Sequence, residues 1–257
     1  MAQPPPPPGL EREQRHPARQ LPLNLPHAPG LGHEDFFVSV SNEKAYAAIE
    51  AWPAWPDPAL ILIGPAGSGK THLGAIWVAR AEGQIRPAAT LASADIEALA
   101  RAGPLLIEDA EAAGQAQTEL FHLLNLMRER AAPLLLTARR PPDAWGLDTA
   151  DLLSRLRLAP CVEIGAPDDA LMRAVLVKLL VDRQLFVDIR VVEYAVLRLE
   201  RSLDAARKFV EALDREALSR QSRISRQMAA DVLSGLGSAA GGCEGEGLRE
   251  EQAQGPT

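Results

Sequence analysis

The sequence has few of the residues that mark disulfide-rich, aromatic-rich or strongly basic proteins. Its 257 residues include only two cysteines, aromatic residues make up 4%, and the formal net charge is −7. Cys161 and Cys243 lie far apart without ligand spacing, so we expect one core thiol, one tail thiol and a reducing compartment. The acidic balance argues against neutralisation of many phosphates. Any contact with DNA should be indirect or confined to a local basic patch.

Long apolar runs are absent as well. No stretch of about 18 apolar residues is present, so we expect no membrane span and no membrane partner. The N-terminus lacks the charged start and apolar block of a secretory signal. These absences predict a protein of a bacterial-type cytoplasm.

Composition divides the chain into a folded middle and two tails. Residues 1–19 are proline-rich and residues 234–257 are rich in Gly and Glu, so neither can bury enough apolar surface to offset chain entropy. We expect both to be disordered. The folded part is predicted to comprise an α/β domain, residues 33–166, and a small helical lid, residues 167–233.

The α/β prediction rests on alternation. From Ala59 to Ile164, the short apolar runs ALILIG, PAATLAS, GPLLIED, APLLLTA and APCVEIG alternate with amphipathic stretches, which predicts βαβ units around a parallel sheet. The lid is predicted from four segments with helical spacing of apolar residues. Asp168, Ser202 and Ser225 stand at N-cap positions of such segments.

The motif GPAGSGKT matches G-x-x-x-x-G-K-S/T and lies between a predicted strand and a predicted helix. Glycines let the backbone N–H groups face phosphates, and the helix N-terminus adds positive dipole. Lys70 would reach the β- and γ-phosphates, and Thr71 would bind Mg²⁺. The predicted ATP- or ADP-binding residues of this loop are Gly64, Pro65, Ala66, Gly67, Ser68, Gly69, Lys70 and Thr71.

The motif GPLLIEDAE places carboxylates at the end of a second buried strand, where ligands bind in parallel sheets. Glu108 takes the metal-side position for Mg²⁺, and Asp109 is predicted to orient the attacking water. In APLLLTARRPPD, Thr137 is the candidate polar contact to the γ-phosphate and water. The sequence leaves open whether Arg139 and Arg140 contact nucleotide, a partner or solvent.

The order of five segments resembles that of the AAA+ ATPases of the DnaA branch. The segments are GPAGSGKTHL, LLIEDAE, LLLTARRPPD, DLLSRLRLAP and a helical segment beginning PDD. The resemblance covers about Phe36 to Leu233 and implies an AAA+ P-loop NTPase core followed by an all-α lid. It implies that Phe37, Val38 and Asn42 flank the adenine.

The predicted roles of two arginines rest on the resemblance alone. Arg155 matches the arginine finger, which reaches the nucleotide of a neighbouring subunit and stabilises charge on the transferred phosphoryl group. Arg201 matches the sensor arginine at the start of a lid helix, which couples phosphate to the lid.

The chain also departs from that pattern. DnaA continues into a basic helix-turn-helix domain, whereas this sequence ends in an acidic Gly-rich segment, so sequence-specific duplex binding is not expected. The segment between the two phosphate-site motifs has room for one strand and one short helix only. Glu108 replaces the usual Asp, which predicts weak intrinsic hydrolysis, and Arg139 stands where the family often has a small polar or acidic residue.

A DnaA-like core without that DNA-binding domain resembles the Hda family of regulatory inactivators of DnaA. Their N-terminal peptide resembles Q-L-x-L-P-L and binds the DNA polymerase sliding clamp. This sequence has QLPLNL at the corresponding place, and its predicted clamp-binding residues are Gln20, Leu21, Leu23 and Leu25. Buried leucines could each contribute about 1.5–3 kcal/mol before ordering costs.

The resemblance implies a negative regulator of replication initiation whose partners are DnaA and the sliding clamp, with DNA reached through the clamp. Two alternatives stay open: a self-sufficient ATPase acting as helicase loader or transposition helper, and a non-enzymatic adaptor that keeps nucleotide for structure. The sequence does not determine whether copies of this chain associate with one another.

Overall fold

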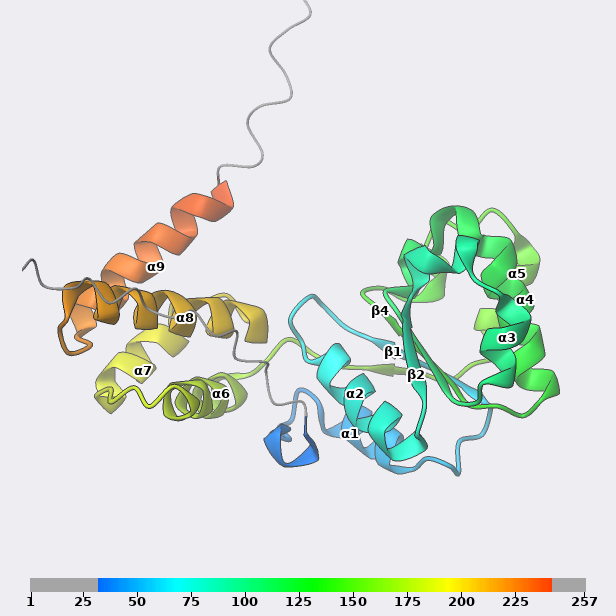
Figure 1. The fold of residues 1–257 in the computed structure, drawn as a ribbon, viewed down its shortest axis with the longest axis horizontal. Coiled ribbons are helices and arrows are strands. Elements are labelled where there is room, and N and C mark those ends of the chain that lie inside the picture. Colours follow the sequence, from blue (N-terminus) through cyan, green and yellow to red (C-terminus); the bar gives the residue numbers. More distant parts are fainter. Residues whose placement is uncertain (1–31, 242–257) are drawn as a thin grey trace, which may run out of the picture. The chain divides into compact units, whose positions relative to one another are not determined.

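The computed structural model describes residues 32–241. Five parallel strands form one sheet in the order β2-β3-β4-β1-β5 (Figure 1). The strands are β1 (Ala59–Ile63), β2 (Gln84–Pro87), β3 (Leu105–Glu108), β4 (Leu134–Ala138) and β5 (Cys161–Glu163). The parallel α/β architecture predicted from alternating runs is therefore present.

Helices cover both faces of this sheet. They are α1 (Glu43–Glu50), α2 (Lys70–Ala81), α3 (Ile96–Arg101), α4 (Gln117–Glu129) and α5 (Ala150–Leu156), with 3-10 helices η1 (His33–Asp35), η2 (Ala88–Ser93), η3 (Ala110–Ala116) and η4 (Pro142–Ala144). Because neighbouring strand residues point to opposite faces, Leu60 and Leu62 pack with α1 and α2, while Ile61 belongs to the core containing α4 and α5.

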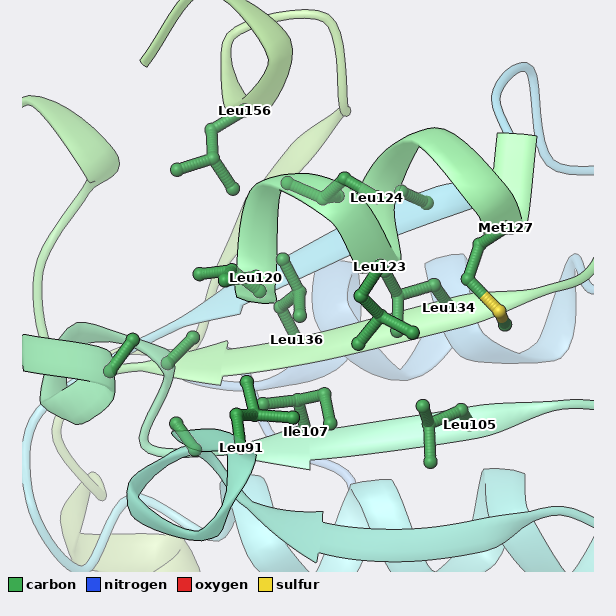
Figure 2. Packing of buried hydrophobic residues seen from close by; sticks show 14 of the residues in the cluster. Leu91, Leu105, Ile107, Leu120, Leu123, Leu124, Met127, Leu134, Leu136 and Leu156 are labelled. Atoms are coloured by element: carbon green, nitrogen blue, oxygen red, sulfur yellow. The ribbon is translucent and has the colours of Figure 1, made fainter. Parts of the chain in front are cut away.

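The larger of these cores joins strands to α4. Figure 2 shows Leu120, Leu123 and Met127 of α4 packed over Leu134 and Leu136 of β4. These five side chains are at most 1% exposed. Helical spacing on α4 and strand alternation on β4 therefore supply matching apolar surfaces, which hold the strand ends that carry the candidate site.

Two local predictions were wrong. The run PAATLAS was predicted as a strand, but it forms η2, and the strand is the preceding QIRP. That strand lies at the sheet edge and pairs only with β3, so it does not need an apolar sequence, whereas Ala88 and Leu91 of η2 are buried. Cys161, predicted as a core thiol, is exposed on β5 at the other edge.

The lid consists of α6 (Asp169–Asp182), α7 (Ile189–Val196), α8 (Leu203–Arg220) and α9 (Arg226–Gly241), which enclose an apolar cluster of their own. The predicted N-caps are confirmed, because Asp168, Ser202 and Ser225 accept hydrogen bonds from backbone N–H groups three residues ahead. The last helix runs through Gly241, whereas we expected the lid to end at Leu233. In the described range, no helix is long and apolar enough to cross a membrane.

Candidate functional site

The phosphate loop connects β1 to α2 with a backbone shape that requires glycine. Gly67 and Gly69 have φ of 70° and 102°, the left-handed region that side chains disfavour. A Cβ on Gly64 would lie 2.5 Å from the carbonyl oxygen of Ile164. Because α2 begins at Lys70, the loop ends at a helix N-terminus. The backbone N–H groups and the positive end of the helix dipole at such a terminus favour phosphate binding.

Lys70 is folded back onto its own loop. Its Nζ donates hydrogen bonds to the carbonyl oxygens of Gly64, at 2.7 Å, and Pro65, at 2.8 Å. Burial lowers the pKa of Lys70 below its ordinary 10.5, and the carboxylates of Asp109 and Glu111 oppose that shift. A bound phosphate would exchange these two carbonyls for charged oxygens, which are better partners for an ammonium group.

The ends of three neighbouring strands meet beside this loop. Glu108 is the partly buried last residue of β3, and Asp109 follows in the left-handed region with φ of 50°. The Asp109 N–H donates to the Thr137 hydroxyl at 3.2 Å, and Thr137 is 2% exposed. The Gly64 N–H donates to the Ala138 carbonyl at 3.1 Å. The structure thus gathers the phosphate loop, both acids and Thr137 at one edge.

The remaining loop residues suit a nucleotide with Mg²⁺. Thr71, Pro65 and Ala66 are exposed, whereas Ser68 is buried and its hydroxyl has no hydrogen-bond partner within residues 32–241. Mg²⁺ is usually held by one or two protein oxygens together with phosphates and water. Thr71 and Glu108 are the residues that could supply those protein oxygens here.

The segment before α1 presents two apolar side chains. Phe37 is 37% exposed and Val38 52%, so both could pack against a base. Asn42 has a different role, because its side chain is buried and holds the turn. Its Nδ2 donates to the Phe37 carbonyl at 2.9 Å and its Oδ1 accepts from the Ser39 N–H at 2.8 Å. We infer that Asn42 shapes the segment that Phe37 and Val38 occupy.

The lid touches the phosphate loop directly. The Leu203 N–H donates to the Gly67 carbonyl at 2.8 Å, and a Cβ on Gly67 would lie 2.0 Å from the Ser202 hydroxyl. Arg201 directly precedes Ser202 and so belongs to the part of the lid that lies at the loop. Its guanidinium, however, forms an ion pair with Asp169 of the lid. Nucleotide would have to compete with that carboxylate for Arg201.

Arg155 lies in the last turn of α5, apart from these contacts. Its side chain is exposed and forms no ion pair with any described residue. An exposed, unpaired guanidinium is suited to a neighbouring molecule. The predicted clamp-binding residues Gln20, Leu21, Leu23 and Leu25 lie outside the described residues.

Sequence reasoning missed Glu111 as a contributor to this site. Glu111 accepts a hydrogen bond from the Arg139 N–H at 2.9 Å, although 28 residues separate them. The cluster of acids in EDAE is the only available signal for Glu111. For Arg139 the sequence left open whether it contacts nucleotide, a partner or solvent, and it did not predict that the Arg139 N–H is bound by Glu111.

Comparison with known proteins identifies the fold. No protein-family model and no curated protein sequence matches this chain. Domain III of the Thermotoga maritima replication initiation protein DnaA matches with a TM-score of 0.68 and 20% identity, covering 82% of this chain and 98% of that one. AMPPCP-bound DnaA from Aquifex aeolicus matches at 0.63 and 21%, covering 75% and 67%.

The Thermotoga maritima RuvB variant R170A also matches, with a TM-score of 0.63 and 17% identity, covering 79% of this chain and 71% of that one. These likenesses confirm the predicted fold class. The chain has the AAA+ P-loop NTPase fold of DnaA domain III and RuvB.

Proposed function

We propose that this protein binds ATP or ADP and regulates replication initiation by promoting hydrolysis of ATP held by DnaA. The observation that carries the nucleotide part is the convergence of Lys70, Asp109 and Thr137 at one edge of a DnaA-like core. The likeness to AMPPCP-bound DnaA supports this part. Phe37 and Val38 would pack against the base, and the loop N–H groups with Lys70 would hold the phosphates.

Hydrolysis on the partner is proposed to use Arg155 in trans. Water attacks the γ-phosphorus, the bond to the β–γ bridging oxygen breaks, and ADP and inorganic phosphate leave. A guanidinium near the transferred group stabilises the charge that develops there, an effect of about 10³–10⁵ in rate. Arg155 supports this role because its side chain is exposed and forms no ion pair with another residue of the described range 32–241.

Hydrolysis in the chain's own site is proposed to be slow. Mg²⁺, held through Thr71 and Glu108, would supply charge neutralisation at the phosphates. Asp109 would orient the attacking water. The side chain of Glu108 is one methylene longer than the Asp that the family has at this position, so its carboxylate would not hold Mg²⁺ in the same place.

The tail is proposed to recruit the sliding clamp. Gln20 and Leu21 would anchor the start of the peptide, and Leu23 and Leu25 would fill apolar subsites. This docking would bring a chain with a formal net charge of −7 to DNA.

The finger is tested by hydrolysis of DnaA-bound ATP with clamp-loaded DNA and the Arg155→Ala protein. We expect stimulation to fall by at least about tenfold while nucleotide and clamp binding persist. Arg157→Ala is the matched control, because Arg157 is an exposed neighbour that pairs with Asp143 instead. Unchanged stimulation by Arg155→Ala, with ADP retained, would favour the non-enzymatic adaptor.

The tail is tested by retention of the full chain on immobilised clamp. Gln20→Ala combined with Leu23→Ala should abolish retention, because both the polar and the apolar contact are removed. Undiminished retention would assign the clamp contact to another part of the chain or remove it from the proposal.

A further inference from the structure

The side chains of two arginines of the lid converge on one tyrosine. The guanidinium carbon of Arg198 lies 3.9 Å from the ring centroid of Tyr194, and that of Arg226 lies 4.7 Å from the same centroid. Tyr194 belongs to α7 and Arg226 is the first residue of α9, and these two helices pack against each other. Arg198 also donates from Nη1 to the Tyr194 carbonyl at 3.4 Å. Contacts with a single residue therefore hold the two guanidinium groups close together.

Both guanidinium groups are exposed and lack a counter-charge. Neither Arg198 nor Arg226 forms an ion pair with another residue of the range 32–241. Arg223, in the segment between α8 and α9, is likewise exposed and unpaired within that range. The face of an aromatic ring attracts a cation but carries no net charge, so it does not cancel the repulsion between two neighbouring guanidinium groups.

The carboxylates of the same two helices are engaged with other cations. Glu193, the only acidic residue of α7, accepts hydrogen bonds from Arg173 at 2.7 and 2.9 Å. Asp231, the only acidic residue of α9, pairs with Arg220 at 3.3 Å. The helices that carry the arginine pair therefore offer it no anion.

Helix stability accounts for only one of the two positions. Arg198 lies just beyond the C-terminal end of α7, where the helix dipole favours a cation. Arg226 begins α9, where the dipole disfavours a cation, and the first turn of this helix has no acidic residue to offset it. An exposed cation that weakens its own helix and has no partner in the described chain is suited to an external anion.

We propose that Arg198 and Arg226, with Tyr194 as their platform, bind the phosphate backbone of DNA. Phosphates recur at a short, fixed spacing along each strand, so two neighbouring guanidinium groups held in place can each meet one. Arginine contacts phosphate oxygens through two parallel, charge-assisted hydrogen bonds. Contacts of this kind position a protein on DNA without reading its sequence. The inference goes beyond the proposed function, in which DNA is reached through the clamp.

The test is fluorescence anisotropy of a short labelled DNA duplex of mixed sequence with the full chain, without clamp or DnaA, over a series of salt concentrations. Arg198→Gln combined with Arg226→Gln should weaken binding at low salt by at least about tenfold, because two phosphate contacts and their counterion release are lost. The slope of the logarithm of affinity against the logarithm of salt concentration should become less steep by about 2, since each neutralised phosphate contributes about 0.9.

Arg190→Gln combined with Arg215→Gln is the matched control. It removes the same charge from the lid, but both arginines have other contacts. Arg190 pairs with Asp188, and Arg215 donates to the carbonyl of Glu211. The control should leave the slope unchanged. Equal losses of affinity in the control and in the first double variant would overturn the inference, because they would reflect the overall charge of the chain.

Arg198→Lys combined with Arg226→Lys keeps both charges and should therefore keep the slope. Loss of the slope in this variant would overturn the inference and assign the arginines to packing of the lid. Competition by poly-L-glutamate as effective as that by unlabelled DNA would also overturn it, since the ligand would then be an acidic peptide. Absence of DNA binding by the unaltered chain would overturn the inference and leave the proposed function standing.

Discussion

Arg128 donates a hydrogen bond from Nη2 to the backbone carbonyl of Arg155, at 3.0 Å. Arg128 lies on α4, its side chain is 15% exposed, and the same Nη2 lies 3.3 Å from Asp57 Oδ1. Asp57 in turn accepts the N–H of Ala59, the first residue of β1. The turn that carries the proposed finger is therefore held to the sheet by a largely buried guanidinium.

Replacement of Arg128 should misplace Arg155. In Arg128→Met the chain should bind nucleotide normally, but its maximal stimulation of DnaA ATP hydrolysis should fall by about tenfold or more, because small displacements of a catalytic group cost large rate factors. The same change leaves Asp57 without its cation, at a cost of about 1–3 kcal/mol in unfolding free energy.

Arg130→Met serves as its control, because Arg130 lies near the same helix end and pairs with Glu97. Full stimulation by a folded Arg128→Met protein would show that Arg155 does not depend on this contact.

Lys70→Ala should abolish tight nucleotide binding without unfolding the chain. The substitution removes the phosphate ammonium, and it also removes a buried cation whose desolvation is costly, so the unfolding temperature should change little. Titration with ADP should show at least a roughly tenfold loss of affinity. Full affinity would mean that nucleotide binds away from this loop.

Gly67→Ala should destabilise the chain in two separable ways. The positive φ costs about 1–2 kcal/mol for any side chain, and the added Cβ would lie 2.0 Å from the Ser202 hydroxyl. Ser202→Gly removes only the second effect. The unfolding free energies of both single variants and the double variant are measured in urea. The double variant should lose less unfolding free energy than the two single variants lose in sum. Strict additivity would refute the close approach of the lid.

Asp168 should make lid stability depend on pH. The Leu171 N–H, followed by the Ser39 hydroxyl, holds the pKa of Asp168 below its ordinary 3.8, despite opposition from burial. A depressed folded pKa means that the stabilisation is complete above the unfolded pKa and is lost as pH falls through the folded one.

The matching measurement is the unfolding free energy of wild type and Asp168→Ala at neutral pH and well below pH 3.8. At neutral pH the variant should be less stable by about 1 kcal/mol, the usual value of an N-cap. The difference should shrink in acid, and a constant difference would contradict the ionised cap.

Local chemistry accounts for what could be predicted. The phosphate loop lies within one strand–turn–helix unit. Its glycine spacing, Lys70 and Thr71 therefore identify it without knowledge of which other segments lie beside it in the fold. The N-caps Asp168, Ser202 and Ser225 were predictable for the same reason, because a cap contacts a backbone N–H only three residues ahead. The edge strand β2 could not be predicted in this way. Its residues are mostly exposed and form no apolar run, and the apolar run that follows it forms η2.

Tertiary structure decided the contacts that join distant segments. The sequence by itself determined the AAA+ class, through the order of local motifs and the alternation of buried strands with helices. It did not determine that Glu111 holds the Arg139 N–H, that Arg128 supports Arg155, or that Ser202 rests on Gly67. These pairs are set by strand order and by packing of the helices and lid on the core, which bring together residues that carry no shared periodicity or spacing.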